Sequence, residues 1–323
     1  RFVSENALAA VGASYSLTNV FISIAIGGGV GASVLTSRYF GERNYGKMKT
    51  SVYTAMISFL AVSLVLGCMG LVFGSQIMQL LNTPENILDQ ATEYLNIYFL
   101  GLPFLFMYNV LAAMFNALGR SRIPLYLLIF SSVFNIVLDI VMVCSFHMGV
   151  AGVAWATLIA QGISAVAAFL LFLKEMKGYE VGKEGKVYDA GALSDMCRIA
   201  LPSILQQSTV SIGMMLVQSV VNSFGAEMLA GFSAGMRIES ISIVPMAAMG
   251  NVISSYTAQN LGAGQRERVV KGYHTAYEIV FAFAALLCVI LELFYRPLIL
   301  LFLGEDGTAL AMATGTSYLR FIG

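Results

Sequence analysis

Residues 8–55 read LAAVGASYSLTNVFISIAIGGGVGASVLTSRYFGERNYGKMKTSVYTA, and residues 229–276 read LAGFSAGMRIESISIVPMAAMGNVISSYTAQNLGAGQRERVVKGYHTA. The two stretches align without a gap, and in both the apolar part ends at a glycine, Gly41 or Gly262, that precedes a basic loop. Apolar helices resemble one another by composition alone, but the matching glycines and basic loops indicate an internal duplication. Identical pairs include Leu8/Leu229, Ala9/Ala230, Ala13/Ala234, Ile22/Ile243, Gly29/Gly250, Ser33/Ser254, Gly41/Gly262, Thr54/Thr275 and Ala55/Ala276.

The rest of the chain consists of further apolar runs, each at least as long as the roughly 20 residues that cross a bilayer. Overall, 58% of the residues are hydrophobic and 11% are charged, whereas about 25% of a soluble domain is charged. So few charges exclude a soluble enzyme, a disordered chain and a nucleic-acid binder, and the net charge of zero attracts no phosphate backbone. Composition therefore predicts an all-α polytopic membrane protein. The expected spans are 6–37, 51–81, 94–118, 123–147, 150–173, 199–224, 228–258 and 273–303, with a ninth beginning near 308.

Lysines and arginines gather in alternate connections between these expected spans. The intervening connections at 82–90, 145–150 and 225–227 contain neither residue. Because basic loops stay on the cytoplasmic side of a membrane, this alternation predicts the orientation of every span. The basic residues in question are Arg38, Arg43, Lys47, Lys49, Arg120, Arg122, Lys174, Lys177, Lys183, Lys186, Arg198, Arg266, Arg268 and Lys271.

The duplication also predicts the size of the complete fold. The two copies cross the membrane in the same direction, so they form a parallel repeat related by an axis along the membrane normal. Counting spans between the copies predicts two lobes of six helices, with a first helix expected before residue 1 and two more after residue 323. The chain would then hold helices 2–9 and part of helix 10. We expect an N-lobe at 1–174, a charged linker at 175–198 and a C-lobe at 199–323.

A carboxylate inside a span is a candidate functional group, because a charge in lipid is costly. Asp139 lies within the span 123–147, and Asn135 and Ser131 precede it at four-residue spacing, so the three form one polar stripe on a helix. A carboxylate with an amide oxygen suits Na+, whereas a lone desolvated carboxylate would carry a proton. The alternative is a structural aspartate that only hydrogen-bonds a neighbouring helix.

Other polar or polarisable residues within spans are candidates for lining a substrate cavity. Gln207 and Ser211 share a helix face, where they could equally hold helices together. Arg237 and Glu239 are two residues apart and point to different faces, toward other helices or toward the outer interface. Tyrosine rings and methionine thioethers can contact flat apolar cations. The candidates are Gln207, Ser211, Tyr15, Arg237, Glu239 and Met236.

Four segments together resemble the multidrug and toxic compound extrusion (MATE) transporters, and they occur in the family's order along the whole chain. These segments are ENALAAVGASYSLTNVFISIAIGGGVGASVLTSRYFG at 5–41, LGRSRIP at 118–124, LPSILQQS at 201–208 and AGMRIESISIVPMAAMGNVISSYTAQNLGAG at 234–264. The resemblance implies a twelve-helix antiporter whose two six-helix lobes face a central cavity. Such transporters export organic, often cationic, compounds in exchange for Na+ or H+.

The resemblance also bears on individual residues. The family places a functional Asn and Asp in helix 5 with the spacing of Asn135 and Asp139, which implies that these two bind the coupling ion. Some members carry a glutamate in helix 7 as a cation site, but the matching run 199–224 contains no acid. This departure puts an ion site on that helix in doubt and favours Asp139.

These considerations predict a secondary active transporter rather than an enzyme, with no cofactor or metal beyond the coupling ion at Asp139. Its partners would be small organic cations and the lipid bilayer, not nucleic acid. We expect a monomer in the plasma membrane (the inner membrane of a bacterium), with the linker 175–198 on the cytoplasmic side.

Three alternatives remain open at this point. A flippase for a lipid-linked saccharide would share the fold, although a cavity for that substrate should be rich in cationic side chains. Within the eight complete spans only Arg237 and, near an outer end, Arg296 are cationic. An intramembrane enzyme would need a nucleophile–base or metal constellation, and no HExxH or GxSxG motif is present. A channel would need a selectivity loop or a charged ring repeated between the halves.

Overall fold

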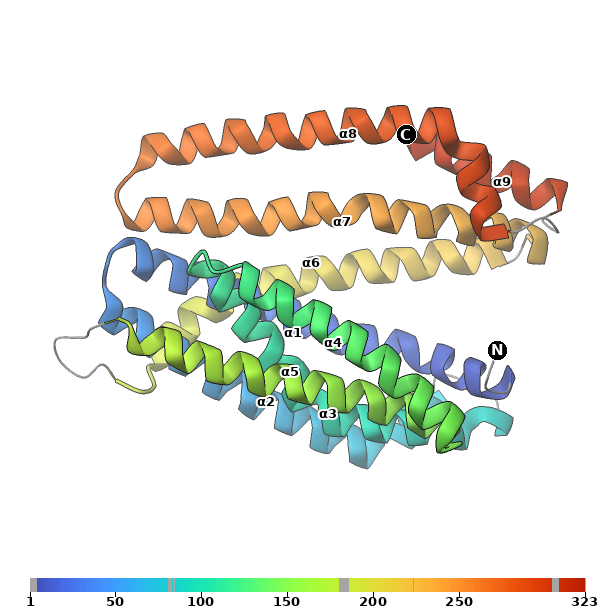
Figure 1. Ribbon diagram of the computed structural model, residues 1–323, viewed down its shortest axis with the longest axis horizontal. Helices are drawn as coiled ribbons and strands as arrows, with labels where there is room; N and C mark the ends of the chain where they lie inside the picture. Colours follow the sequence, from blue (N-terminus) through green and yellow to red (C-terminus); the bar gives the residue numbers. More distant parts are fainter. Residues whose placement is uncertain are drawn as a thin grey trace. The chain divides into compact units, whose positions relative to one another are not determined.

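The computed structural model describes residues 5–80, 83, 85–179, 186–222, 224–303 and 308–322, apart from the side chains of a few helical residues. In these residues the chain forms long α-helices joined by short connections (Figure 1). The helices are α1 (Glu5–Gly41), α2 (Tyr45–Leu80), α3 (Glu85–Ala117), α4 (Arg122–Ile140), α5 (Gly149–Lys177), α6 (Ala190–Asn222), α7 (Ala226–Gly262), α8 (Arg266–Leu303) and α9 (Ala309–Ile322), and a π-helical turn (Val141–Ser145) continues α4.

Seven helices in the described part of the chain are long and apolar enough to cross a membrane. They are α1 to α5, with α4 including its π turn, together with α7 and α8. The prediction of an all-α polytopic fold is therefore confirmed. The run predicted at 199–224 corresponds to α6, which ends at Asn222 but begins earlier and includes the charged residues Asp195 and Arg198.

The helix boundaries follow the internal duplication. Helix α1 and helix α7 begin and end at aligned positions, and α2 and α8 also begin at aligned positions. The turns between them share their backbone hydrogen bonds. The amide of Asn44 donates to the carbonyl of Tyr39 at 3.0 Å, and the aligned amide of Gln265 donates to the carbonyl of Asn260 at 2.8 Å. The two copies therefore fold into the same helix–turn–helix.

This shared turn contains a left-handed residue, at Arg43 (φ 56°) in one copy and at Gly264 (φ 71°) in the other. A side chain in this region is strained by about 1 kcal/mol, and glycine is not. We expect Arg43→Gly to stabilise the protein by about 1 kcal/mol and Gly264→Arg to destabilise it by a similar amount. Thermal unfolding in detergent measures both changes. Arg43→Ala is the control, because it removes the charge but keeps the strained Cβ; stabilisation by Ala equal to that by Gly would contradict the backbone explanation.

By internal contacts the chain divides into two compact units, Arg1–Gln207 and Ser208–Gly323, which are described separately. The division falls inside α6, whose first half belongs to the first unit. Because α6 begins at Ala190, the end of the segment expected as a linker, 175–198, is helical. The assignment of lobes at 1–174 and 199–323 stays a prediction.

In the first unit, α3 is the central helix and packs against α1, α2 and α5. Large buried side chains fill these contacts, as where Phe115 meets Phe172 edge to face with ring centroids 5.0 Å apart. Helix α4 lies alongside α5 (Figure 1) and leaves most of its apolar side chains exposed; Ile136, for example, is 58% exposed. Such an apolar surface is expected where a helix faces lipid.

In the second unit, α7 packs against both α8 and α9, and α8 also contacts α9. Figure 1 shows α7 and α8 running side by side in opposite directions. A small core of buried residues joins the three helices, namely Ala234, Ile238, Leu291, Ile299 and Leu319. This arrangement fixes the face of α7 that meets α9.

Candidate functional site

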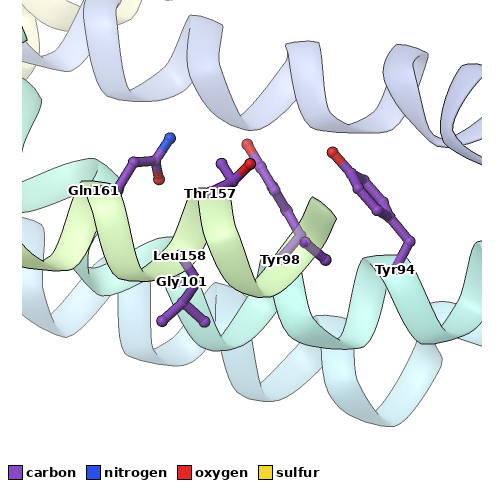
Figure 2. Close-up of a pocket in the computed structure, with 7 residues that line it drawn as sticks. Tyr94, Tyr98, Gly101, Thr157, Leu158 and Gln161 are labelled. Carbon is purple, nitrogen blue, oxygen red and sulfur yellow. The ribbon is translucent and has the colours of Figure 1, made fainter. Parts of the chain in front are cut away.

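A small pocket lies between α3 and α5 in the first unit (Figure 2). Its cavity volume is about 10 Å3, close to the space that one water-sized particle requires. The polar ends of Tyr94, Tyr98, Thr157 and Gln161 point to the same side in Figure 2. The lining residues are Tyr94, Tyr98, Gly101, Ala154, Thr157, Leu158 and Gln161.

Helix α4 brings the predicted polar stripe next to this pocket. The side-chain amide of Asn135 donates to the Oγ1 atom of Thr157 at 3.4 Å. That hydroxyl in turn donates to the carbonyl of Val153 at 3.0 Å. Asp139 follows Asn135 by four residues and so lies one turn further along the same face of α4. Asn135 therefore contacts a residue that lines the pocket, and Asp139 lies one turn away from it on the same helix face.

The carboxyl group of Asp139 has an unused oxygen. Its Oδ1 atom is withdrawn from solvent and has no hydrogen-bond partner within the described part of the chain. Leaving a buried polar atom unpaired costs about 1–3 kcal/mol. The π turn Val141–Ser145 begins two residues later, and such turns occur frequently at functional sites. A cation or a proton bound at Asp139 would satisfy this oxygen.

The side chains of this polar stripe and of the pocket offer carboxylate, amide and hydroxyl oxygens. Carboxylate, amide and hydroxyl oxygens are hard ligands that suit Na+, and the carboxylate alone suits a proton. The hydroxyl of Tyr98 donates to the Thr18 carbonyl at 3.3 Å, which ties α3 to α1 at this level. No cluster of three His, Cys, Asp or Glu side chains suited to a metal occurs among the described residues. The donor set therefore fits the coupling ions that the sequence suggested.

The candidates on α7 lie in the second unit. Arg237 is exposed, Met236 and Glu239 are half-buried, and Ile238 between the two charged residues is buried. Arg237 and Glu239 thus point to different faces, as their spacing predicts. Glu239 accepts a hydrogen bond from the hydroxyl of Tyr318 on α9.

The remaining candidates lie on other helices. Gln207 is exposed and Ser211 is half-buried, both on α6 and on either side of the division between the units. Tyr15 is in α1, and its side chain lies outside the described residues. The structure therefore brings Asn135 and Asp139 together with one pocket, but it does not place these three residues at it.

Sequence reasoning missed Tyr94, Tyr98 and Thr157. Tyr94 and Tyr98 are four residues apart and so share one face of α3, which was a usable signal. Nothing in the sequence connected that face with Asp139 on α4 or Thr157 on α5, because only the tertiary packing brings the three helices together.

Comparison with known proteins gives a consistent picture. The MatE family model matches residues 1–141 and 202–323. A probable multidrug resistance protein of Bacillus subtilis, YpnP, is 30% identical over 321 residues, which are 99% of this chain and 71% of the relative. An FAD transporter of Shewanella oneidensis is 25% identical over 313 residues, covering 93% of this chain and 68% of the relative.

A solved structure shows the same fold. An outward-facing multidrug resistance MATE transporter of the MOP superfamily matches with a TM-score of 0.87 and 24% identity, over 98% of this chain and 71% of that one. Members of this family are multidrug transporters and not enzymes, which removes the intramembrane-enzyme alternative. From the match of the family model to most of its length, this multi-pass membrane chain belongs to the MatE family of multidrug efflux transporters.

Proposed function

We propose that this protein is an antiporter that exports organic cations in exchange for Na+ or H+, with Asp139 and Asn135 as the ion site. One observation carries the proposal: a carboxylate oxygen of Asp139, withdrawn from solvent, has no partner among the described residues. It lies one helical turn from Asn135, which contacts Thr157 in the lining of a pocket that also presents hydroxyl and amide groups. A cation or proton satisfies this oxygen in a way that no protein group there does.

Ion binding and substrate binding are coupled because each ligand binds a different conformation of the transporter. An ion entering from outside binds Asp139 and favours the state that releases substrate outward. After the lobes rock, the ion leaves to the cytoplasm and the substrate binds from the cytoplasm or the inner leaflet. Each ligand favours a different state, so the two bind with negative coupling. We place the protein in the plasma membrane as a monomer. The alternating basic loops support a cytoplasmic position for the segment 175–198.

Separately imposed gradients test this proposal. We expect full-length protein in vesicles to move ethidium in the direction opposite to the ion flow that an imposed Na+ or H+ gradient drives. The transport rate should saturate with ethidium concentration, and the direction should reverse when the gradient is reversed. Antiport requires this behaviour because ion and substrate exchange through one set of states. Flux that does not saturate and ignores both gradients would indicate a channel and contradict antiport.

A second candidate is export of an anionic compound, because one relative is an FAD transporter. The exposed cationic side chain of Arg237 on α7 suits such a substrate. Competition in the same vesicles separates the candidates. We expect excess tetraphenylphosphonium, and not excess FAD, to slow ethidium movement; the reverse result would favour the anionic substrate. A lipid-linked saccharide as the competing species distinguishes the flippase alternative in the same way.

A further inference from the structure

The second unit contains a hydrogen bond between a carboxylate and a phenol inside the membrane span. The hydroxyl of Tyr318 on α9 donates to Oε2 of Glu239 on α7. The ring of Tyr318 meets Phe232 edge to face, with centroids 5.1 Å apart. It also lies against Gly235, where an added Cβ would be 2.5 Å from ring atom Cδ1. Packing on these two sides holds the Tyr318 hydroxyl at the carboxylate.

No cation neutralises Glu239 among the described residues, and the charged groups around it are otherwise engaged. On α9, Arg320 pairs with Glu292 of α8 at 3.7 Å and lies 5.6 Å from the ring centroid of Tyr295. On α7 itself, Arg237 is exposed and points to a different face. On α8, the other charged group toward this end is Arg296, which has no ion pair in the described structure, whereas Glu278 lies nearer the opposite end of the helix. The part of α6 in this unit, 208–222, has no ionisable residue.

The number of oxygens distinguishes this site from the one at Asp139. Hard metal cations gather several oxygen ligands, and the pocket beside Asp139 offers hydroxyl and amide groups from two helices. Among the described residues, the one side chain that hydrogen-bonds to Glu239 is the Tyr318 hydroxyl. A proton needs only the carboxylate. When Glu239 takes up a proton its acid O–H becomes a donor, and the Tyr318 hydroxyl can then turn to accept it.

We propose that Glu239 is a second proton-binding group of the transport cycle, located in the C-terminal unit and positioned by Tyr318. This inference rests on the proposed antiport. In the cycle, the Glu239 carboxylate gains one proton from the outer side and becomes a neutral acid, then returns that proton to the cytoplasmic side as substrate binds. Asp139 is on α4 whereas Glu239 is on α7, at the position aligned with Thr18 of α1, so superposing the halves does not relate the two acids.

Proton release on substrate binding tests the proposal directly. Purified full-length protein is titrated with tetraphenylphosphonium in weakly buffered detergent solution from pH 5 to 8, and both bound probe and released protons are measured. We expect Glu239→Gln to release about half as many protons per bound probe as wild type, because one of two titrating carboxyls is lost. Glu278→Gln is the matched control, an exposed acid of α8, and should release the wild-type number.

A carboxyl-retaining variant separates proton binding from packing. Glu239→Asp keeps a titratable group, so we expect it to restore release, whereas loss equal to that of Glu239→Gln overturns the proposal. Wild-type release by Glu239→Gln also overturns it, even if Asp139→Asn loses protons as the antiport requires. Failure of the antiport itself has a different signature: on binding the probe, the wild-type protein then releases neither protons nor, when loaded with it, Na+.

Discussion

Replacing Asp139 by Asn in the full-length protein is expected to lower ion-coupled ethidium efflux by about 50-fold or more. The amide is nearly isosteric with the carboxylate but holds neither a proton nor the charge that attracts Na+. The change therefore leaves helix packing in place and removes the group through which an ion favours one state over the other. Initial rates of efflux in vesicles, with each gradient imposed in turn, measure the effect.

Asp89→Asn provides a matched control for this measurement. Asp89 is an exposed carboxylate near the start of α3, so the same chemical change there should leave efflux at the wild-type rate. Wild-type rates and an unaltered ion dependence in Asp139→Asn would remove Asp139 from the ion site. If Asp139→Asn lost both ethidium binding and ethidium efflux, Asp139 would instead have a role in binding the substrate.

Replacing Gly231 by Ala is expected to cause the largest loss of stability, about 3 kcal/mol. An added Cβ at Gly231 would overlap the carbonyl oxygen of Ala311 and lie 2.9 Å from its carbonyl carbon and 3.0 Å from the amide nitrogen of Gly315. All three atoms belong to the backbone of α9, so no side chain can turn aside and the whole helix must move. Close backbone approach at small residues is a general mode of packing for membrane helices.

Gly250→Ala makes the same change on the same helix where nothing lies within 4 Å of the added Cβ. Alanine favours helix by up to about 1 kcal/mol over glycine, so this variant should be as stable as wild type or slightly more stable. Thermal unfolding in detergent should thus shift in opposite directions for the two variants. A common downward shift would mean that loss of glycine itself, and not the contact with α9, controls stability.

Most of the helical layout could be predicted because long apolar runs and basic loops follow from local composition. The start of α6 could not, because it depends on a distant contact. The carboxylate of Asp189 accepts a hydrogen bond from the amide of Ala192 at 3.0 Å, and the amide of Asp189 is 3.0 Å from the hydroxyl of Thr54 on α2. Charged residues near the end of a span look like a linker in the sequence, yet here they extend a helix.

Some of the candidate functional residues could also be predicted from local sequence, whereas others depend on contacts between distant segments. Asp139 is conspicuous in the sequence because a carboxylate is rare within an apolar run. Tyr94 in the pocket lining belongs to a different helix, and tyrosines within spans are too common to be singled out. Glu239 was recognised as a candidate, but its partner Tyr318 lies 79 residues further along the chain. The acidic residues can be identified in the sequence by their charge. The side chains that lie beside them on other helices can be identified only from the packing of the helices.

The turn that α1–α2 and α7–α8 share has a consequence for how the evolution of the two halves can be traced. Its residues differ completely between the copies, Glu42-Arg43-Asn44 against Ala263-Gly264-Gln265, yet the backbone hydrogen bonds are retained. The two copies therefore share the path of the chain although their side chains differ, even at the left-handed position, which is arginine in one copy and glycine in the other. Ancestral half-length proteins should then be easier to recognise by the placement of such turns than by residue identity.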